Sequence, residues 1–229
     1  MLLEIHRQKL LACGLTPETW EKARLHSGSD AEVKEVLGYG GAGTGLVIPY
    51  ADDFARVRID HPGPDQRRYR SPRGSTGRLY VPGSLQGALS DPSVALHITE
   101  GEFKALKAAQ EGFPCLALAG VWSWKQRLHG KSLSIPDLDR VAWTDRRVVV
   151  VFDSDLAEKP PVAWAEHALC QELRRRGAQV YVVRLPEGPR GEKYGLDDFL
   201  VARGAEAFKS LPMLTIGEAD QERPVFLRM

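Results

Sequence analysis

One segment, Arg146 to Ala157 with the sequence RRVVVVFDSDLA, places the strongest constraint on how this chain can fold. Its four valines and a phenylalanine form a continuous apolar run, typical of a strand buried on both faces within a parallel sheet. The run ends at Asp153 and Asp155, and side chains two residues apart in a strand point to the same side. Two carboxylates this close repel each other, and removing them from water costs still more. We therefore expect a cation at this end of the strand.

The surrounding sequence alternates between strand and helix patterns. Apolar strand patterns occupy 93–99, 114–120, 146–153 and 178–185. A helical pattern ended by glycine lies between the first two strands (101–112) and another between the last two (161–177). Strand–helix–strand units with right-handed crossovers build parallel sheets. The sequence thus predicts an α/β fold in which a parallel sheet is flanked by helices.

The first 91 residues have a different character. They are helical to about residue 37, where Thr16 and Asp30 are predicted to cap helices. Short strand candidates follow at 46–50, 54–60 and 78–81. Between Arg56 and Arg78 there are seven arginines and only two aspartates. We predict a small, irregular α+β basic subdomain over 1–91, a second domain over 92–211 and a tail over 212–229.

Composition narrows the class of protein. The net charge of +1 gives no bulk basic excess that would require a nucleic-acid partner. No apolar run approaches the ~18 residues of a membrane span. Cys13, Cys115 and Cys170 are odd in number and far apart, which favours a reducing cytoplasm over a disulfide framework. No CxxC pair exists, so a zinc ribbon is excluded. We expect a cytoplasmic protein with neither membrane nor zinc binding.

Acidic residues follow three of the predicted strands. In open parallel sheets, ligand sites form beyond the carboxyl ends of the strands. Glu100 ends the first strand and the two aspartates end the third, while a further acidic pair, Asp197 and Asp198, follows the fourth. Hard oxygen ligands of this kind suit Mg²⁺ or Mn²⁺. Each acid could instead cap a helix N-terminus, but three clusters at one sheet edge favour a metal site.

This arrangement resembles the Toprim domain of primases, type IA and type II topoisomerases and certain nucleases. The resemblance covers about residues 93–203 and rests on Glu100-Gly101 and on the D-x-D of Asp153 and Asp155. It implies that these three acids are catalytic metal ligands. The segment GLDDFL is similar to an acidic segment of primases in which Asp197 and Asp198 match the last two acidic positions, implying further ligands.

The resemblance also extends to neighbouring features. Many primases carry an aspartate four residues after the first glutamate, where this chain has Lys104, which could contact a phosphate or point to solvent. Similar EGE-x-K-A-L sequences occur in uncharacterised Toprim-like domains of phages, plasmids and integrated elements, often beside replicative helicases. The resemblance therefore implies replication of a mobile element or phage, with a helicase as partner.

The N-terminal part is similar to the basic subdomain of bacterial primases. The stretches GLVIPY, ARVRID, RRYRSP and GRLYVP occur in a similar order before HITEGE. The resemblance implies four ligands for template phosphates or a triphosphate: Arg58, Arg68, Arg70 and Arg73. Arginines beside an acidic metal edge would make a phosphate-binding groove; the alternative is a solvated basic loop. Of Trp122 and Trp124, one could pack inward and the other stack on a base, a role we assign to Trp124.

The sequence as a whole indicates a primase-like nucleotidyltransferase that makes short primers from NTPs on a single-stranded DNA template with Mg²⁺ or Mn²⁺. Two alternatives stay open. A Toprim nuclease would use the same acids on a water nucleophile, and a non-catalytic module would bind nucleic acid or a partner within a replication complex.

Overall fold

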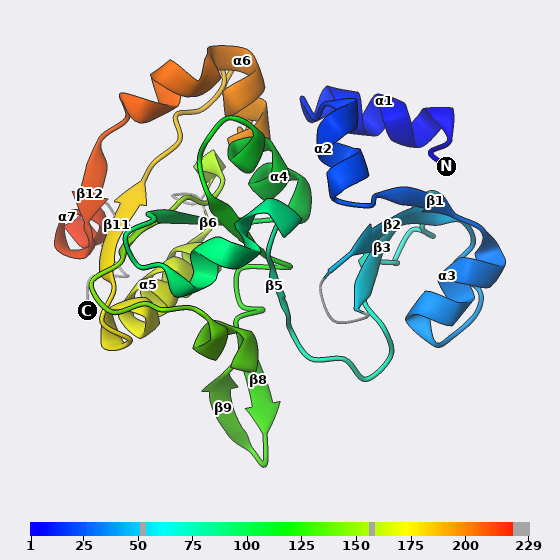
Figure 1. Ribbon diagram of the computed structural model, residues 1–229, viewed down its shortest axis with the longest axis horizontal. Helices are drawn as coiled ribbons and strands as arrows, with labels where there is room; N and C mark the ends of the chain where they lie inside the picture. Colours follow the sequence, from blue (N-terminus) through cyan, green and yellow to red (C-terminus); the bar gives the residue numbers. More distant parts are fainter. Residues whose placement is uncertain (51–53, 156–158, 222–229) are drawn as a thin grey trace.

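A computed structural model describes residues 1–50, 54–155 and 159–221 (Figure 1). The N-terminal elements are α1 (Glu4–Ala12), α2 (Pro17–Lys22), β1 (His26–Gly28), α3 (Asp30–Leu37), β2 (Gly45–Pro49), β3 (Ala55–Ile59) and β4 (Tyr69–Arg70). The central elements are β5 (Leu79–Tyr80), β6 (Leu96–Glu100), α4 (Glu102–Gln110), β7 (Cys115–Leu118), β8 (Lys125–Leu128), β9 (Lys131–Ser134) and β10 (Arg147–Val150). The last are α5 (Pro160–Arg175), β11 (Gln179–Val183), α6 (Leu196–Lys209), β12 (Met213–Thr215) and α7 (Ile216–Gln221), and short 3-10 helices lie at Gly83–Ser90 and Pro136–Arg140.

The N-terminal helices begin at polar caps. Thr16 caps α2 as predicted, accepting a backbone N–H from its first turn, and Pro17 is the first helical residue. The prediction for α3 was wrong by one residue, because Ser29 is its cap and Asp30 already lies inside the helix. The Asp30 carboxylate instead accepts the N–H of Gly43 at 3.1 Å, which ties the glycine-rich turn to the helix. Strands β1 to β4 form an antiparallel sheet in sequence order.

The main sheet has the order β12-β11-β10-β6-β7-β5. Its four middle strands are parallel and correspond to the four strands predicted from the sequence. The two outer strands, β5 and β12, pair antiparallel with their neighbours. The predicted fold class is therefore confirmed. Both outer strands come from outside residues 92–211, and the division of the chain into three ranges stays a prediction.

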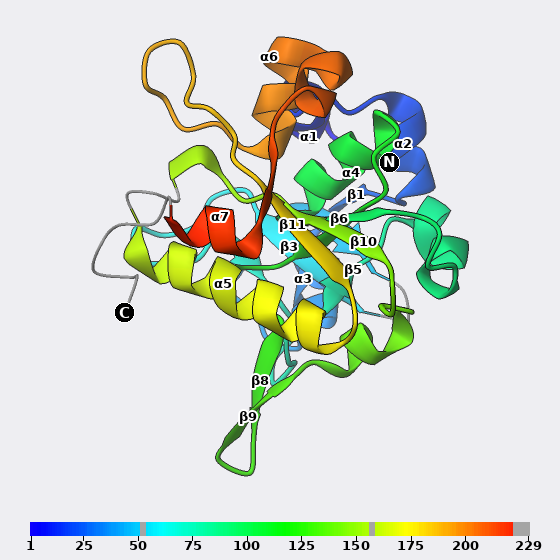
Figure 2. The ribbon, with the colours of Figure 1, turned by 90° about the vertical axis from the view of Figure 1, so that its left-hand side faces the viewer.

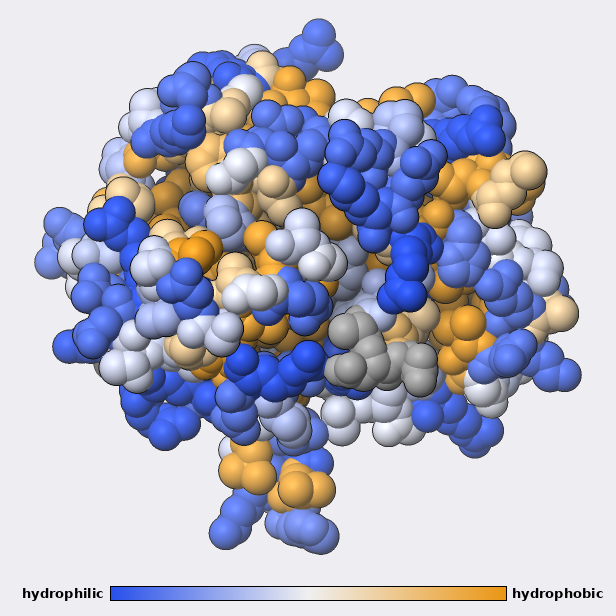
Figure 3. Space-filling model, in the orientation of Figure 1, coloured by the Kyte–Doolittle hydropathy of each residue, from blue (hydrophilic) through white to orange (hydrophobic). Residues whose placement is uncertain are grey.

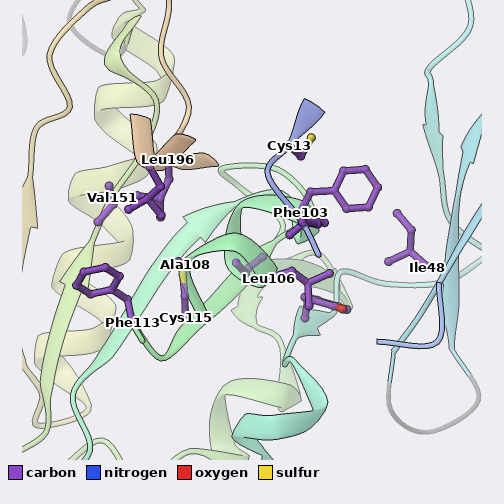
Figure 4. Close-up of a cluster of buried hydrophobic side chains, with 14 of the residues drawn as sticks. Cys13, Ile48, Phe103, Leu106, Ala108, Phe113, Cys115, Val151 and Leu196 are labelled. Carbon is purple, nitrogen blue, oxygen red and sulfur yellow. The ribbon is translucent and has the colours of Figure 1, made fainter. Parts of the chain in front are cut away.

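Strand β10 is buried on both faces, as its sequence predicts. Val149 and Val151 lie in a cluster with residues of α1, β2, α4 and α6, part of which is drawn in Figure 4. Val148 and Val150 face the opposite cluster, with α5 and α7, and these two helices lie together on one side of the sheet (Figure 2). Each fully buried valine contributes about 1.5 kcal/mol or more to stability. These layers fix the direction in which the strand delivers Asp153.

A hairpin of β8 and β9 projects from the body (Figures 1 and 2). No sequence pattern predicts it, because its strands lack an apolar alternation. Its turn residues, His129 and Gly130, both have positive φ (48° and 76°), as the tight two-residue turns of hairpins require. Leu128 and Leu133 are exposed on it, and Figure 3 shows apolar surface on the projection at the lower edge of the molecule. Among the described helices, none has the length and apolarity of a membrane span.

Candidate functional site

The carboxyl ends of β6 and β10 and the start of α6 meet at one edge of the sheet. Asp153 and Asp155 follow β10 and lie close enough for one ammonium group to reach both. Lys193 Nζ lies 2.7 Å from Asp153 Oδ2 and 3.4 Å from Asp155 Oδ2. Lys104 pairs with the other oxygen of Asp153, and Lys159 pairs with Asp155. The cation expected from the sequence is thus present as three lysine side chains.

These ion pairs control the charge of the edge. Burial would raise the pKa of Asp155, but its contacts with Lys159 and Lys193 outweigh burial and leave the pKa below its ordinary value. Burial would likewise lower the pKa of Lys193, yet contact with Asp153 and Asp155 raises it. Asp155 and Lys193 therefore stabilise each other's charged forms. The three lysines bring positive charge to the two aspartates of this edge.

The other predicted acids occupy different environments. Glu100 ends β6, and its pKa is raised, first by burial. Asp197 is buried, which raises its pKa, and its Oδ1 has no hydrogen-bond partner among the described residues. Asp198 accepts the N–H of Gly195 at 3.0 Å and so caps α6, the alternative role considered from the sequence. Within the described residues, no three Asp, Glu, His or Cys side chains converge closely enough to hold a metal ion.

The second glutamate of the TEGE motif is held by residues of the N-terminal part of the chain. Glu102 is buried and accepts hydrogen bonds from Tyr50 Oη at 2.7 Å and from Arg56 Nη1 at 2.5 Å. Arg56 comes from β3 and also lies over the ring of Tyr69, 5.5 Å from its centroid. Glu102 therefore joins the small antiparallel sheet to the first helix of the main sheet, with one carboxylate oxygen bonded to both Tyr50 and Arg56.

Two cavities extend from the acidic edge toward the arginine-rich segment. The smaller, of about 350 Å³, is lined by lysines that include Lys104 and Lys193 and by five acids: Glu100, Glu102, Asp153, Asp197 and Asp198. The larger, of about 860 Å³, is lined by Tyr39 and by residues from three ranges, 66–72, 75–77 and 119–123. Arg56, Tyr69, Glu100 and Ala119 line both. We call the two cavities together the groove.

Of the four arginines predicted from the sequence, one lines the groove and three do not. Arg70 lines the groove, and its guanidinium is held by Gln66. Arg58, Arg68 and Arg73 are not among the described residues of its wall. Arg56 and Arg67 line it without having been predicted. Arg56 could have been found from strand alternation, since residues 56 and 58 share one face of β3, but Arg67 carries no signal that separates it from its neighbours.

The tryptophan next to the groove is not the one chosen from the sequence. Trp124 is 3% exposed and packs in the core, whereas Trp122 is 41% exposed and lines the larger cavity. The two rings stack at 6.4 Å, and Lys125 Nζ lies 4.8 Å from one centroid and 4.4 Å from the other. The ring available to a base is therefore Trp122. Lys159 and Lys193 were also missed, since an isolated lysine gives no sequence signal for an ion pair.

Comparison with known proteins finds a matching family and one related protein. The family described as "Domain of unknown function (DUF3854)" matches residues 85–207. An uncharacterised protein of Picosynechococcus sp. is 28% identical over 154 residues, and the match covers 60% of this chain and 15% of that protein. The chain thus spans a small part of this curated relative.

Three solved structures have the same fold. The zinc-binding and RNA polymerase domains of Aquifex aeolicus primase match with a TM-score of 0.65 at 17% identity, over 96% of this chain and 61% of that one. A DnaG primase catalytic domain bound to single-stranded DNA gives 0.64 at 18%, over 93% and 73%. The RNA polymerase domain of Mycobacterium tuberculosis DnaG gives 0.67 at 16%, over 94% and 78%. The Toprim fold of primase type expected from the sequence is confirmed.

Proposed function

This chain belongs to the DUF3854 family, whose description assigns no activity, and from its primase-type fold we propose that it is a primase-like nucleotidyltransferase that joins nucleotides into short primers on single-stranded DNA. The observation that carries the proposal is the groove. Glu100 and Arg56 line both of its cavities, so an acidic edge and an arginine-rich wall face a shared space. Single-stranded DNA, NTPs and a replicative helicase are the partners we propose, in replication of a mobile element or phage.

The residues of the acidic edge fit a hard divalent ion. Asp153 and Asp155 already hold cationic groups. Asp197 lines the smaller cavity together with Asp153, and its buried Oδ1 has no hydrogen-bond partner in the described ranges. Mg²⁺ is commonly bound by only one or two carboxylates, with waters and substrate phosphates completing its shell. We propose Asp153 and Asp155 as ligands, with Glu100 beside them. When bound, Mg²⁺ or Mn²⁺ would activate a 3′-hydroxyl and stabilise the leaving pyrophosphate.

The wall of the groove suits the remaining parts of the substrate. Arg67 and Arg70 line it, and guanidinium groups bind phosphate oxygens in pairs. Trp122 offers an exposed ring, and stacking of a base on an aromatic ring is tolerant of sequence. We propose that the arginines hold a triphosphate or template phosphates and that Trp122 orients a template base.

Primer synthesis tests the proposal directly. The protein is incubated with single-stranded DNA, labelled NTPs and Mg²⁺ or Mn²⁺, and products are separated by length. We expect extension products in wild type and none with Asp153→Asn/Asp155→Asn. Arg73→Ala, a change outside the groove wall, should retain synthesis. Metal-dependent cleavage of the DNA without incorporation of NTPs would replace this proposal with a nuclease, and binding without either reaction would indicate a non-catalytic module.

The arginines are tested separately by DNA affinity. Each phosphate-binding arginine that is removed should flatten the slope of log affinity against log salt by about 1. The double variant Arg67→Ala/Arg70→Ala should therefore flatten it by about 2. Arg73→Ala is the matched control and should leave the slope unchanged. Equal slopes for all three proteins would place the DNA away from this groove.

A further inference from the structure

Lys104 occupies the centre of the acidic edge. It extends from α4 to Asp153 Oδ1 and passes beside the start of α6. A Cβ at Gly195 would lie 2.6 Å from its Cε, 3.2 Å from its Nζ and 2.9 Å from Asp197 Oδ1. The lysine stem and the Asp197 carboxylate therefore both lie close to Gly195, where a side chain would clash with them. The ammonium group thus lies between Asp153 Oδ1, with which it pairs, and the start of α6.

The other two lysines differ from Lys104 in exposure. Side-chain exposure is 19% for Lys104 but 48% for Lys193 and 52% for Lys159. The two exposed lysines contact Asp153 Oδ2 and Asp155, on the other side of the pair. An exposed ion pair contributes little, and an incoming divalent ion can displace it. A mostly buried ammonium with an enclosed stem is held more firmly.

This asymmetry limits the number of metal ions. Two-metal sites place their ions roughly 3.5–4 Å apart, with ligands that serve both. Here one oxygen of Asp153 is engaged by the enclosed ammonium, and only the other oxygen lies on the exchangeable side. No third acid converges with the pair in the described part of the chain, so the ligands do not provide for a second ion.

We propose that this site binds one divalent ion, at Asp153 Oδ2 and Asp155, and that Lys104 is a built-in cation in the place where a second ion would lie. The inference rests on the proposed metal-dependent function and specifies its stoichiometry. Lys104 is then a positioning residue that fixes Asp153 for the ion. Its ammonium group offsets one negative charge of the acidic edge and, being covalently attached, cannot be replaced by an ion from solvent.

Mn²⁺ titration without nucleotide or DNA tests the stoichiometry apart from any activity. Free Mn²⁺ is followed by electron paramagnetic resonance, and calorimetry gives the affinity. We expect one ion in wild type and two in Lys104→Asp, which removes the ammonium and supplies a carboxylate. Lys193→Ala, the matched control, should still bind one ion, about fivefold more tightly, because only a weak, exposed competitor is removed.

Each outcome supports or overturns the inference. Two ions in wild type, or one ion in a folded Lys104→Asp, would overturn it while leaving the primase proposal intact. No specific binding in wild type would remove the metal site itself and therefore both proposals. If circular dichroism shows that Lys104→Asp is unfolded, Lys104→Asn removes the same charge and offers an amide oxygen, and it carries the same expectation of a second ion.

Discussion

Replacing Glu102 with leucine should destabilise the protein more than any surface substitution, because it leaves a buried cation without its partner. Glu102 begins α4 and receives hydrogen bonds from Tyr50 and from Arg56, whose side chain is 8% exposed. The Nε of Arg56 is already without a partner among the described residues. Loss of Glu102 would leave the guanidinium with the Tyr50 hydroxyl and the face of Tyr69, neither of which carries a compensating negative charge.

The expected magnitudes follow from burial. Removing one member of a buried ion pair costs about 3–5 kcal/mol, so Glu102→Leu and Arg56→Met should each lose that much unfolding free energy. Replacing both members with apolar side chains is often nearly neutral, so the double variant should lose less than either single variant. Tyr50→Phe removes one hydrogen bond to a charged acceptor and should cost about 1.5 kcal/mol.

Urea unfolding followed by circular dichroism measures all four variants. The slope of free energy against urea should stay constant if every variant unfolds in one cooperative step. The coupling energy from the cycle should exceed about 3 kcal/mol in favour of the double variant. Additive losses, or a cost below about 1 kcal/mol for Glu102→Leu, would show that the two groups do not form the buried pair described here.

Three further predictions concern other parts of the chain. Trp122→Ala should weaken single-stranded DNA binding by about 1–3 kcal/mol with unchanged stability, whereas Trp124→Ala should lower stability by about 3–5 kcal/mol, as anisotropy and urea unfolding can show. Gly77→Ala would place a Cβ 1.9 Å from the carbonyl oxygen of Ser123, so thermal unfolding should reveal a loss of about 1–3 kcal/mol. Arg175, with lesser help from its neighbours, lowers the pKa of Glu172 to about 2 from 4.5. The stability from this shift is complete above pH 4.5 and is lost as the pH falls toward 2, so the stability difference between wild type and Glu172→Gln should shrink over that interval in acid titrations.

The sequence was most informative where local pattern and burial agree. The valine run fixed β10 and its neighbours because only a strand covered on both faces accommodates it. Asp153 and Asp155 lie together as predicted, since Lys193 reaches both, although both come after the strand rather than within it. Helix caps were less certain, since Ser29 and Asp30 are both good caps and only the backbone conformation separates them.

Features that depend on tertiary contacts were not predictable. Strand β12 is short and was not predicted, and β5 was predicted at 78–81 but without its place at the edge of the main sheet. The hairpin of β8 and β9 has polar strands and shows no alternation. Trp122 and Trp124 lie two residues apart on either side of Ser123, and their opposite exposure depends on how the loop meets the core. Lys193 is distant in sequence from the aspartates it contacts. To predict any of these features, one would have to know which segments that are distant in sequence pack together in the fold.

The segment between β4 and β5 links the geometry of the two sheets to whatever fills the groove. Residues 71–72 and 75–77 line the larger cavity and also form the covalent connection from one sheet to the other. A ligand in that cavity therefore contacts the chain that sets the spacing of the sheets. A ligand that prefers one spacing of the sheets stabilises that spacing. By thermodynamic linkage, a partner that fixes this spacing must raise the affinity for the ligand, and the ligand must raise the affinity for the partner by the same factor. A protein docked on the small sheet could in this way regulate binding without touching the groove.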